Sequence, residues 1–442
     1  MIGKRVPLAV LGSVLLAAYA CGEERAEVSQ YGVTWAFEKP TAVGQFVNGD
    51  WWVAGPVTVK SVTPAPAPGR NGSVVNPRAG DAQGYDDRIP NYEAKLAAGF
   101  PLKLEPGKSL VSTASLEKVG DKTPDTVPDQ YCRGPLRTAT VLTCVEKPPA
   151  PDAFRPPYVG DAKPAFSAKQ LRRDILPRLK APCAVPDRTA YERVLQRIWL
   201  DHKREWTSRA MHPLENMPDY GRELTNITSR VGLLLLVEDP DKRNETLLIR
   251  FVQLGIDLYG ITQSDGHLWT ANGGHHSGRK WPVVFAGVML DHEGMQKVRA
   301  TFAEDAQTYF GKGFKGQKAL FHLCDGVNGK HEEVDPATWK TYGQGDNNGE
   351  KADAYRRLNG PTWVGQALAA RLMGAKAFWD HDAYFDYVDR WWSEEVEGKD
   401  EKTATGEAGG ELARRMWETY RKQADEIGAA VTKKRTEGAG RP

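Results

Sequence analysis

The sequence predicts an α+β chain in which a β-sandwich-like module precedes a helical domain, and three observations support this. Residues 31–147 are rich in Gly and Pro and alternate β-branched with aromatic residues, without a helical period. Six prolines then fall within residues 148–165, which predicts a Pro-rich linker. From residue 166 to 430, apolar residues recur at helical spacing.

The β module is predicted from short runs that follow one another closely. Residues 33–37 and 52–59 carry the alternation of strands, and Asn48-Gly49 between them is a strong hairpin signal. Residues 57–62 extend the second run until prolines end it, and residues 110–116 and 138–145 predict further strands. Together these runs have the length of one sandwich-like domain.

The helical domain is predicted from a longer series of amphipathic segments with polar loops between pairs of them. This succession suits an α/α-toroid, an incomplete α/α barrel whose loops at one end bind ligand. The predicted helices cover residues 168–180, 189–206, 224–238, 243–259, 280–290, 295–310, 363–372, 383–392 and 412–427.

The N-terminus has the features of an export signal. Lys4 and Arg5 precede an apolar stretch that ends in Ala18-Tyr-Ala20, a small-x-small cleavage pattern. Cys21 follows directly, so residues 1–21 predict a lipoprotein signal with lipidation at Cys21, or plain cleavage after Ala20. We expect an exported protein of the bacterial cell envelope, or a secreted one, that meets a membrane only through this anchor.

Composition excludes some partners. The chain has 442 residues, 40% hydrophobic and 26% charged, with Lys+Arg 59 against Asp+Glu 57. That near balance gives no reason to expect nucleic acid binding. Export permits disulfides, and Cys132 and Cys144, which flank Gly134-Pro135, are placed to close a hairpin; four unpaired thiols are the alternative.

The segment Asn272-Gly-Gly-His-His-Ser-Gly-Arg-Lys280 is the strongest candidate site. Its glycines permit positive φ, and His275 or His276 can move a proton near neutral pH. Asn272 and Arg279 can hold an anion, and Lys280 adds a second cation for binding. Together they suggest proton abstraction beside a carboxylate, whereas a helix N-cap with Arg279 in an internal ion pair is the structural alternative.

Three further segments carry candidate residues, and each also has a structural interpretation: a turn with a surface ion pair, a flexible surface connection, and a hairpin turn followed by core tryptophans. Tyr220 and Arg222, before a predicted helix, offer a proton donor and a carboxylate partner. The Gly-rich segment 342–349, with Tyr342, suits a loop that closes over a ligand. One wall of a sugar cleft is suggested by Gln45, Asn48 and Trp51. No histidine or cysteine group has a recognised zinc spacing, so no metal is expected.

The runs at residues 272–282, 217–222 and 362–371 resemble secreted bacterial proteins related to polysaccharide lyases, including alginate and glucuronan lyases, which have an α/α-toroid. The resemblance covers roughly residues 165–430. It implies that Asn272 neutralises a carboxylate, that His275 or His276 is the base and that Tyr220 or Tyr342 is the acid. It implies no organic cofactor and an anionic polysaccharide as the substrate.

The function expected is β-elimination of a uronic-acid-containing polysaccharide, and two alternatives stay open. A glycoside hydrolase on the same scaffold needs two carboxylates across a cleft, with Asp219, Glu223, Asp265 and Asp346 as candidates. A noncatalytic glycan-binding lipoprotein would need neither histidine.

Overall fold

The structure is a computed structural model that describes residues 22–127, 133–240, 244–264, 268–323, 330–344, 347–397, 399 and 410–438. Several predictions made from the sequence fall outside these residues. They are the export signal with Cys21, the cysteines Cys132 and Cys324, and the hydrolase candidates Asp265 and Asp346.

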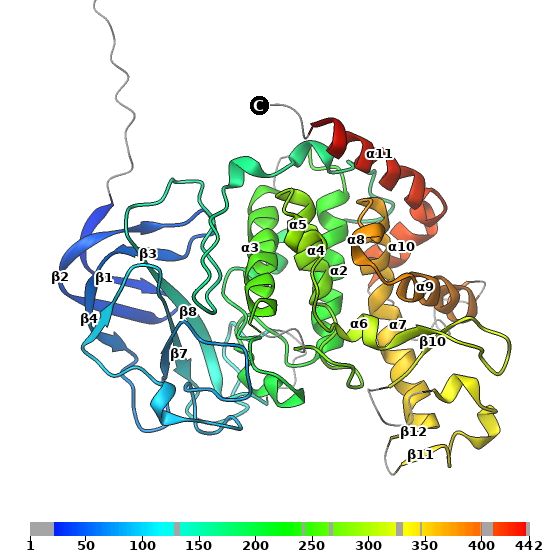
Figure 1. The fold of residues 1–442 in the computed structure, drawn as a ribbon, viewed down its shortest axis with the longest axis horizontal. Coiled ribbons are helices and arrows are strands. Elements are labelled where there is room, and N and C mark those ends of the chain that lie inside the picture. Colours follow the sequence, from blue (N-terminus) through cyan, green and yellow to red (C-terminus); the bar gives the residue numbers. More distant parts are fainter. Residues whose placement is uncertain are drawn as a thin grey trace, which may run out of the picture.

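A β-rich N-terminal half is confirmed, but its strands form one curled, half-barrel sheet (Figure 1). The order is β5-β7-β8-β3-β2-β4-β6, with β1 also paired to β2. In the described residues the strands therefore do not divide into the two sheets of a sandwich. Their bounds are β1 (Glu23–Gln30), β2 (Val33–Gln45), β3 (Trp51–Ala54), β4 (Val57–Thr63), β5 (Ser73–Val75), β6 (Leu102–Leu104), β7 (Ser109–Ser115) and β8 (Leu136–Val145).

Alternation along β2 explains how the sheet buries one face. Val33, Trp35 and Phe37 are buried, whereas the residues between them are partly exposed. The turn predicted at Asn48-Gly49 joins β2 to β3: Gly49 has φ 93°, and the Phe46 N–H donates to the Asp50 carbonyl at 2.9 Å. Glycine adopts this left-handed conformation without steric cost.

Helices dominate the second half, as predicted. They are α1 (Arg188–Leu195), α2 (Gly221–Leu236), α3 (Asn244–Thr262), α4 (Lys280–Met289), α5 (Glu293–Gln296), α6 (Ala303–Ala306), α7 (Gly349–Leu372), α8 (Lys376–Trp379), α9 (Asp382–Glu395), α10 (Glu411–Tyr420) and α11 (Ala424–Gly438). Two small hairpins interrupt them, formed by β9 (Thr308–Phe310) with β10 (Ala319–Phe321) and by β11 (Gly343–Gln344) with β12 (Asn347–Asn348).

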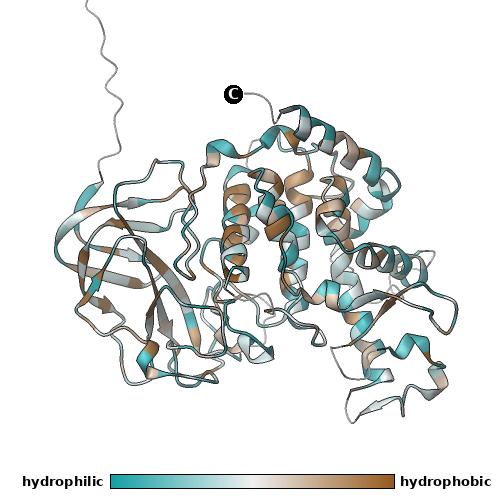
Figure 2. Cartoon of the chain, in the orientation of Figure 1, coloured by the Kyte–Doolittle hydropathy of each residue, from teal (hydrophilic) through white to brown (hydrophobic). Residues whose placement is uncertain are grey.

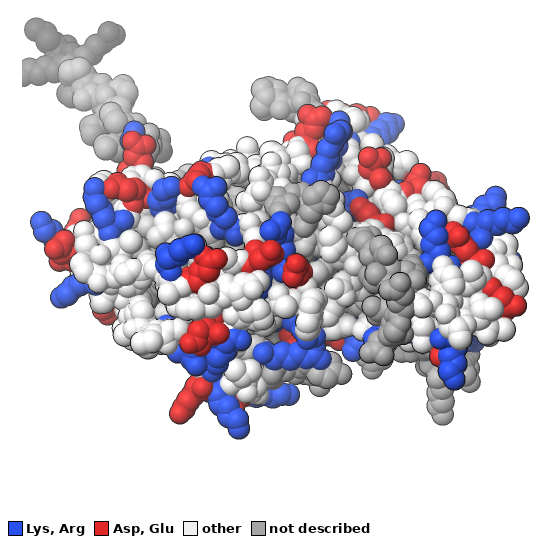
Figure 3. Space-filling model, turned by 60° about the horizontal axis from the view of Figure 1, so that its bottom comes forward, with Lys and Arg blue, Asp and Glu red and all other residues white. Residues whose placement is uncertain are grey.

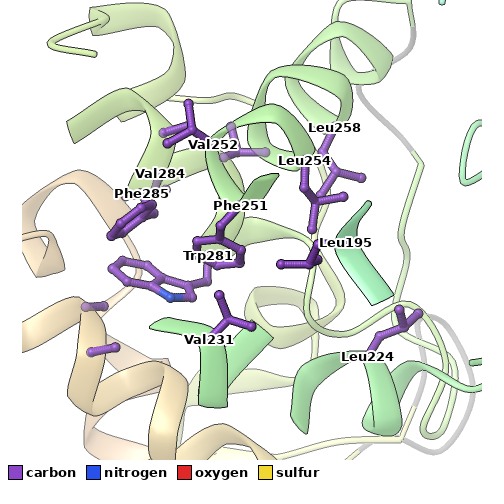
Figure 4. Packing of buried hydrophobic residues seen from close by; sticks show 14 of the residues in the cluster. Leu195, Leu224, Val231, Phe251, Val252, Leu254, Leu258, Trp281, Val284 and Phe285 are labelled. Carbon is purple, nitrogen blue, oxygen red and sulfur yellow. The ribbon is translucent and has the colours of Figure 1, made fainter. Parts of the chain in front are cut away.

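The helical core is built around α2, α3 and α4, which are among the most apolar elements (Figure 2). Trp281 and Phe285 of α4 pack on Phe251 of α3, and the Trp281 ring reaches α2 (Figure 4). A Cβ on Gly232 would lie 2.3 Å from the Trp281 Nε1 atom, so the close contact of α2 with α4 requires glycine there. In the described residues no helix is long and apolar enough to span a bilayer.

Two predicted helices are wrong, and a third is predicted too long. Residues 168–180 form only two 3-10 turns, and Leu176 is extended, as expected for a residue before proline. The helix predicted over residues 189–206 ends at Leu195, because the polar residues that follow, such as Arg197 and Asp201, are buried in ion pairs. Residues 295–310 divide among α5, α6 and β9.

The segment 148–165 connects the sheet to the helices through a buried arginine. Arg155, 1% exposed, donates its Nε–H to Asp50 Oδ2 at 2.5 Å, and Asp50 follows β2. Its two terminal nitrogens donate to Asp257 of α3 at 2.9 and 2.5 Å. The predicted Pro-rich linker is thus packed between the two halves.

Candidate functional site

The loop from Asn272 to Lys280 lies between α3 and α4, as predicted, and Lys280 is the first residue of α4. Gly273 and Gly278 have φ of 57° and 94°, and His276 also has a positive φ of 67°. A Cβ on Gly274 would lie 2.5 Å from the Tyr220 ring. Glycine therefore lets this loop lie directly against the residue that precedes α2.

Hydrogen bonds from several elements hold this loop. The Gly273 carbonyl accepts from Gln307 Nε2 at 2.7 Å and from Asn359 Nδ2 of α7 at 2.8 Å. The Gly278 N–H donates to Glu304 of α6 at 2.8 Å. Burial raises the pKa of Glu304. A loop fixed in this way can hold catalytic side chains at set positions.

His275, Tyr220 and Tyr355 come together at the start of α2. The rings of His275 and Tyr220 lie 4.3 Å apart, centre to centre, and the Tyr220 hydroxyl donates to that of Tyr355, from α7, at 3.3 Å. His275 is 9% exposed, whereas both tyrosines are half-buried. One proton acceptor and two phenols thus share one edge of the helical domain.

Arginines surround these rings. Arg222 lies over the Tyr220 ring at 5.4 Å, although it also pairs with Glu223 at 2.7 Å. Arg209 lies over the ring of Trp206 at 4.3 Å, and that ring is 6.3 Å from His275. Among the described residues no carboxylate forms a salt bridge with Arg209. The site can therefore attract an anion.

Burial and the neighbouring charges determine the protonation states of the site residues. Burial, with contributions from His276 and Arg209, holds the pKa of His275 far below its ordinary value, so the imidazole is neutral. Burial and the neighbouring Tyr355 raise the pKa of Tyr220, so its phenol keeps its proton at neutral pH. Burial together with Arg133 lowers the pKa of Arg209. An anionic ligand would offset this local positive charge.

Asp219 is the buried acid of the site. Its side chain is 1% exposed and lies 3.7 Å from the Arg133 Nε atom, and neither carboxylate oxygen has a hydrogen bond. Burial raises the pKa of Asp219 to about 6, against the lowering effect of Arg133. This is the pKa range of a general acid, but the carboxyl faces the protein interior.

Two cations predicted to bind the substrate, Arg279 and Lys280, form internal ion pairs in the structure. Arg279, 1% exposed, donates to both carboxylate oxygens of Asp201 at 2.7 and 3.0 Å. Lys280 is buried, forms an ion pair with Asp305 and donates to the Trp379 carbonyl at 2.5 Å. Both hold the loop and α4 in place, so the internal ion pair considered for Arg279 is the correct interpretation.

The other two predicted site residues of the loop, His276 and Asn272, are held differently from His275. His276, 2% exposed, donates its Nδ1–H to the Thr270 carbonyl at 2.9 Å, and burial lowers its pKa. Asn272 is half-buried, and its carbonyl accepts from the His275 N–H at 2.9 Å. Of the two histidines, His275 is the one that contacts Tyr220.

Other predicted site residues lie elsewhere. The N–H of Tyr342 donates to Thr338, and its side chain is a neighbour of Tyr309. Gln45 and Trp51 line a shallow hollow of about 310 Å³ on the sheet, together with Pro149 and Pro151. Asn48 is buried and donates to Asp50 at 2.7 Å, so it stabilises the turn.

The predicted disulfide finds no support. Cys144 is a free thiol, fully buried in β8, and its Sγ donates to the Leu104 carbonyl at 3.4 Å. Burial raises the pKa of Cys144 to about 12. Its intended partner, Cys132, lies outside the described residues.

Three residues of the site were missed from the sequence: Tyr355, Arg209 and Trp206. Tyr355 lies in a helix of ordinary polar composition, and no local pattern marked it. Trp206 is 47% exposed, and an exposed tryptophan beside an arginine is a signal only once its surface position is known. Within the described residues, no group of three His, Cys, Asp or Glu side chains is placed to hold a metal.

Comparison with known proteins returned no match to a family model, to a curated protein or to a solved structure.

Proposed function

We propose that this protein is a polysaccharide lyase that cleaves a uronic-acid-containing polymer by β-elimination. The observation that carries the proposal is the contact of the neutral His275 with Tyr220, whose hydroxyl is bonded to Tyr355, with Arg222 over the Tyr220 ring and Arg209 over the neighbouring Trp206 ring. Such a set supplies a base, an acid and a neutralised carboxylate site without a cofactor. The proposal includes an α/α-toroid arrangement of the helices, in keeping with the lyase resemblance.

Each of these side chains has one role in the proposed reaction. His275 removes the C5 proton of the uronate, the C–H electrons form the C4=C5 double bond, and the C4–O bond breaks. Tyr220 protonates the departing oxygen. Arg222 and Arg209 neutralise the substrate carboxylate and stabilise the enolate-like transition state, the role first expected of Asn272 and Arg279. The site is restored when a proton returns from His275 to Tyr220.

Substrate binding makes this base effective. Burial and neighbouring positive charge keep the pKa of His275 low. A bound carboxylate brings an opposite charge close to the imidazole, which raises its pKa toward the range of a useful base. Neutral polymers lack this carboxylate, so we expect that they are not cleaved.

The cell envelope is the proposed location, with an anionic polysaccharide as the partner. Export and a lipid anchor at Cys21 are proposed from the leader pattern of residues 1–21. An enzyme held there would meet extracellular polymers directly.

The test is an incubation of residues 22–442 with alginate, glucuronan, pectate, heparinoid and chondroitin. A lyase produces an unsaturated uronate that absorbs in the ultraviolet. A rise with one polymer that is lost in His275→Ala, and kept in His292→Ala, supports the proposal. His292 is the matched control because it packs between Phe166 and Tyr259, away from the loop. A flat trace on every polymer contradicts it.

Asp219 favours a second candidate, a glycoside hydrolase on the same scaffold. Its pKa of about 6, raised chiefly by burial, suits an acid that protonates a glycosidic oxygen. A hydrolase needs a second carboxylate across the cleft. The nearest predicted one, Glu223, is paired with Arg222. New reducing ends without ultraviolet absorbance, lost in Asp219→Asn, would establish this activity instead.

A further inference from the structure

The hairpin of β9 and β10 carries an unusual surface. Phe310 and Phe314 are 57% and 54% exposed, among the most exposed large apolar side chains of the described residues. Lys312, Lys315 and Lys318 are also exposed. No Asp or Glu occurs between residues 308 and 321. Two exposed rings and three exposed cations thus share one short hairpin, and its strand β10 lies beside α9 (Figure 1).

The hairpin is held by its own backbone hydrogen bonds and by its buried base. The Gly311 N–H donates to the Lys318 carbonyl at 2.8 Å, and the Gly313 N–H donates to that of Gln317 at 2.8 Å. Gly316 completes the turn with φ 88°. At the base, Leu320 and Phe321 are fully buried. A ligand that binds this surface therefore does not have to order it, which favours affinity.

Carboxylates near the hairpin are paired with other cations. Glu394 and Glu395 line a hollow together with Phe314 and Lys315, but Glu394 pairs with Arg390, and Glu395 pairs with Arg356 and Lys399. Glu332 pairs with Arg390 at 2.5 Å and accepts from the Phe321 N–H at 2.6 Å. Glu333 lies against Gly311 and is 3.9 Å from the Lys330 ammonium. None of the salt bridges among the described residues involves Lys312, Lys315 or Lys318. Their charges are directed at solvent.

Both ends of the hairpin are joined to the loop that carries His275. Gln307, just before β9, donates to the carbonyls of Gly273 and Leu323 at 2.7 and 3.0 Å. Leu323, just after β10, accepts from the Gly273 N–H at 3.0 Å. The His322 N–H closes the base by donating to Gln307 at 3.0 Å. The hairpin is therefore fixed relative to the proposed catalytic residues.

We propose that the β9–β10 hairpin is a binding arm for an anionic polysaccharide, remote from the bond that is cleaved. Lys312, Lys315 and Lys318 bind carboxylates or sulfates of successive sugars, and Phe310 and Phe314 pack against the apolar faces of the rings. This inference rests on the proposed function for its substrate class. We do not propose a membrane surface as the ligand. The predicted lipid anchor precedes β1 in the sheet, whereas the hairpin belongs to the helical half and is joined to the His275 loop.

The test measures binding, not turnover. Residues 22–442 migrate through native gels that contain the polymers of the activity panel, or neutral dextran. We expect retardation by an anionic polymer, weakened about tenfold in Lys312→Gln/Lys315→Gln/Lys318→Gln and decreased further by salt. The control is Lys60→Gln/Lys95→Gln/Lys103→Gln, which removes the same charge from exposed sites on the sheet side. A second variant, Phe310→Ser/Phe314→Ser, weakens binding without a change in charge.

The outcomes separate the two proposals. Retardation that depends on the hairpin, without any unsaturated product, supports the arm and contradicts the lyase. Product formation with KM and retardation unchanged in both hairpin variants overturns the arm alone. Hairpin-dependent binding to phosphatidylglycerol vesicles, with polymer binding unchanged, also overturns it. For the lyase, the arm predicts raised KM and unchanged kcat on polymers, and no effect of the variants on short oligosaccharides.

Discussion

Tyr220 is the residue on which the proposed chemistry depends most. It precedes α2, contacts His275 through its ring and donates its hydroxyl to Tyr355. Because burial keeps its phenol protonated, it can serve as the acid at neutral pH. A group in that role typically contributes two to four orders of magnitude to the rate.

Tyr220→Phe therefore should lower kcat about 100-fold or more with little change in thermal stability, since only a half-buried hydroxyl is removed. Tyr420→Phe is the control. Tyr420 is the last residue of α10, and its hydroxyl donates to the Lys180 carbonyl at 2.7 Å, so this variant also removes one bonded hydroxyl. Initial rates of ultraviolet absorbance give the comparison. A Tyr220→Phe rate within a factor of two of the wild type would exclude Tyr220 as the acid.

Asp219 predicts a pH-dependent stability. Its pKa is raised from 3.8 to about 6 by burial, so the folded state binds this proton more tightly than the unfolded state does. The destabilisation is absent below the unfolded pKa and grows as pH rises from about 4 to 6, reaching about 3 kcal/mol. Asp219→Asn should raise the free energy of unfolding at pH 8 and leave it unchanged near pH 3. Equal effects at both pH values would contradict this.

Some residues of the candidate site can be predicted from the sequence. His275, Tyr220 and Arg222 were identified because each lies beside glycines or a helix start. Tyr355 was not, because it is 135 residues from Tyr220 along the chain and meets it only after α2 and α7 pack together. Arg279 was assigned to the ligand because a guanidinium in a loop cannot be distinguished from one paired internally until its partner, Asp201, is placed.

Among the elements, the crossing of α3 and α4 depends on one glycine. A Cβ on Gly255 would lie 2.3 Å from the Pro282 carbonyl oxygen and 2.6 Å from Ala286 Cβ. Alanine is the better helix former, so local propensity and packing oppose each other here. Packing should prevail because both neighbours belong to a fully buried helix.

We expect Gly255→Ala to lower the free energy of unfolding by about 1–3 kcal/mol. Gly99→Ala is the matched control, since no atom lies within 4 Å of its added methyl group. Chemical denaturation of both variants provides the measurement. If Gly255→Ala were as stable as the control, the helices would have to separate more easily than their packing suggests.

The elements themselves were predicted unevenly. Strands with clear alternation, such as β2, and long helices, such as α3, follow from their own residues. Residues 168–180 failed because Pro177 keeps Leu176 extended. Residues 295–310 failed because short apolar runs fit helix and strand equally, and tertiary contacts decide between them. Sequence also did not reveal that β3 and β8 pair in parallel, a contact between distant segments.

For the whole molecule, the buried Arg155 joins the sheet to the helices. It pairs with Asp50 and with Asp257, and all three side chains are at most 6% exposed. Removing the arginine leaves two carboxylates without a countercharge, which costs about 3–5 kcal/mol. Arg155→Met should therefore destabilise the protein by this amount, whereas Arg78→Met, in an exposed pair with Asp161, should change it by less than about 1 kcal/mol. Equal denaturation midpoints would contradict the proposed connection.

Surface charge does not favour anions as a whole. The formal net charge is +2, and acidic and basic residues are interspersed over the face in Figure 3. Binding of an anionic polymer must therefore come from local groups, first Arg209 and Arg222 and then the hairpin lysines. Such local attraction is screened by salt, so KM should rise with ionic strength.

The most direct test of the central claim is ultraviolet absorbance during incubation of residues 22–442 with the panel of uronate polymers. We predict a rise with at least one polymer, abolished in His275→Ala and reduced about 100-fold in Tyr220→Phe. A trace that stays flat on every polymer while new reducing ends appear would contradict elimination and favour hydrolysis.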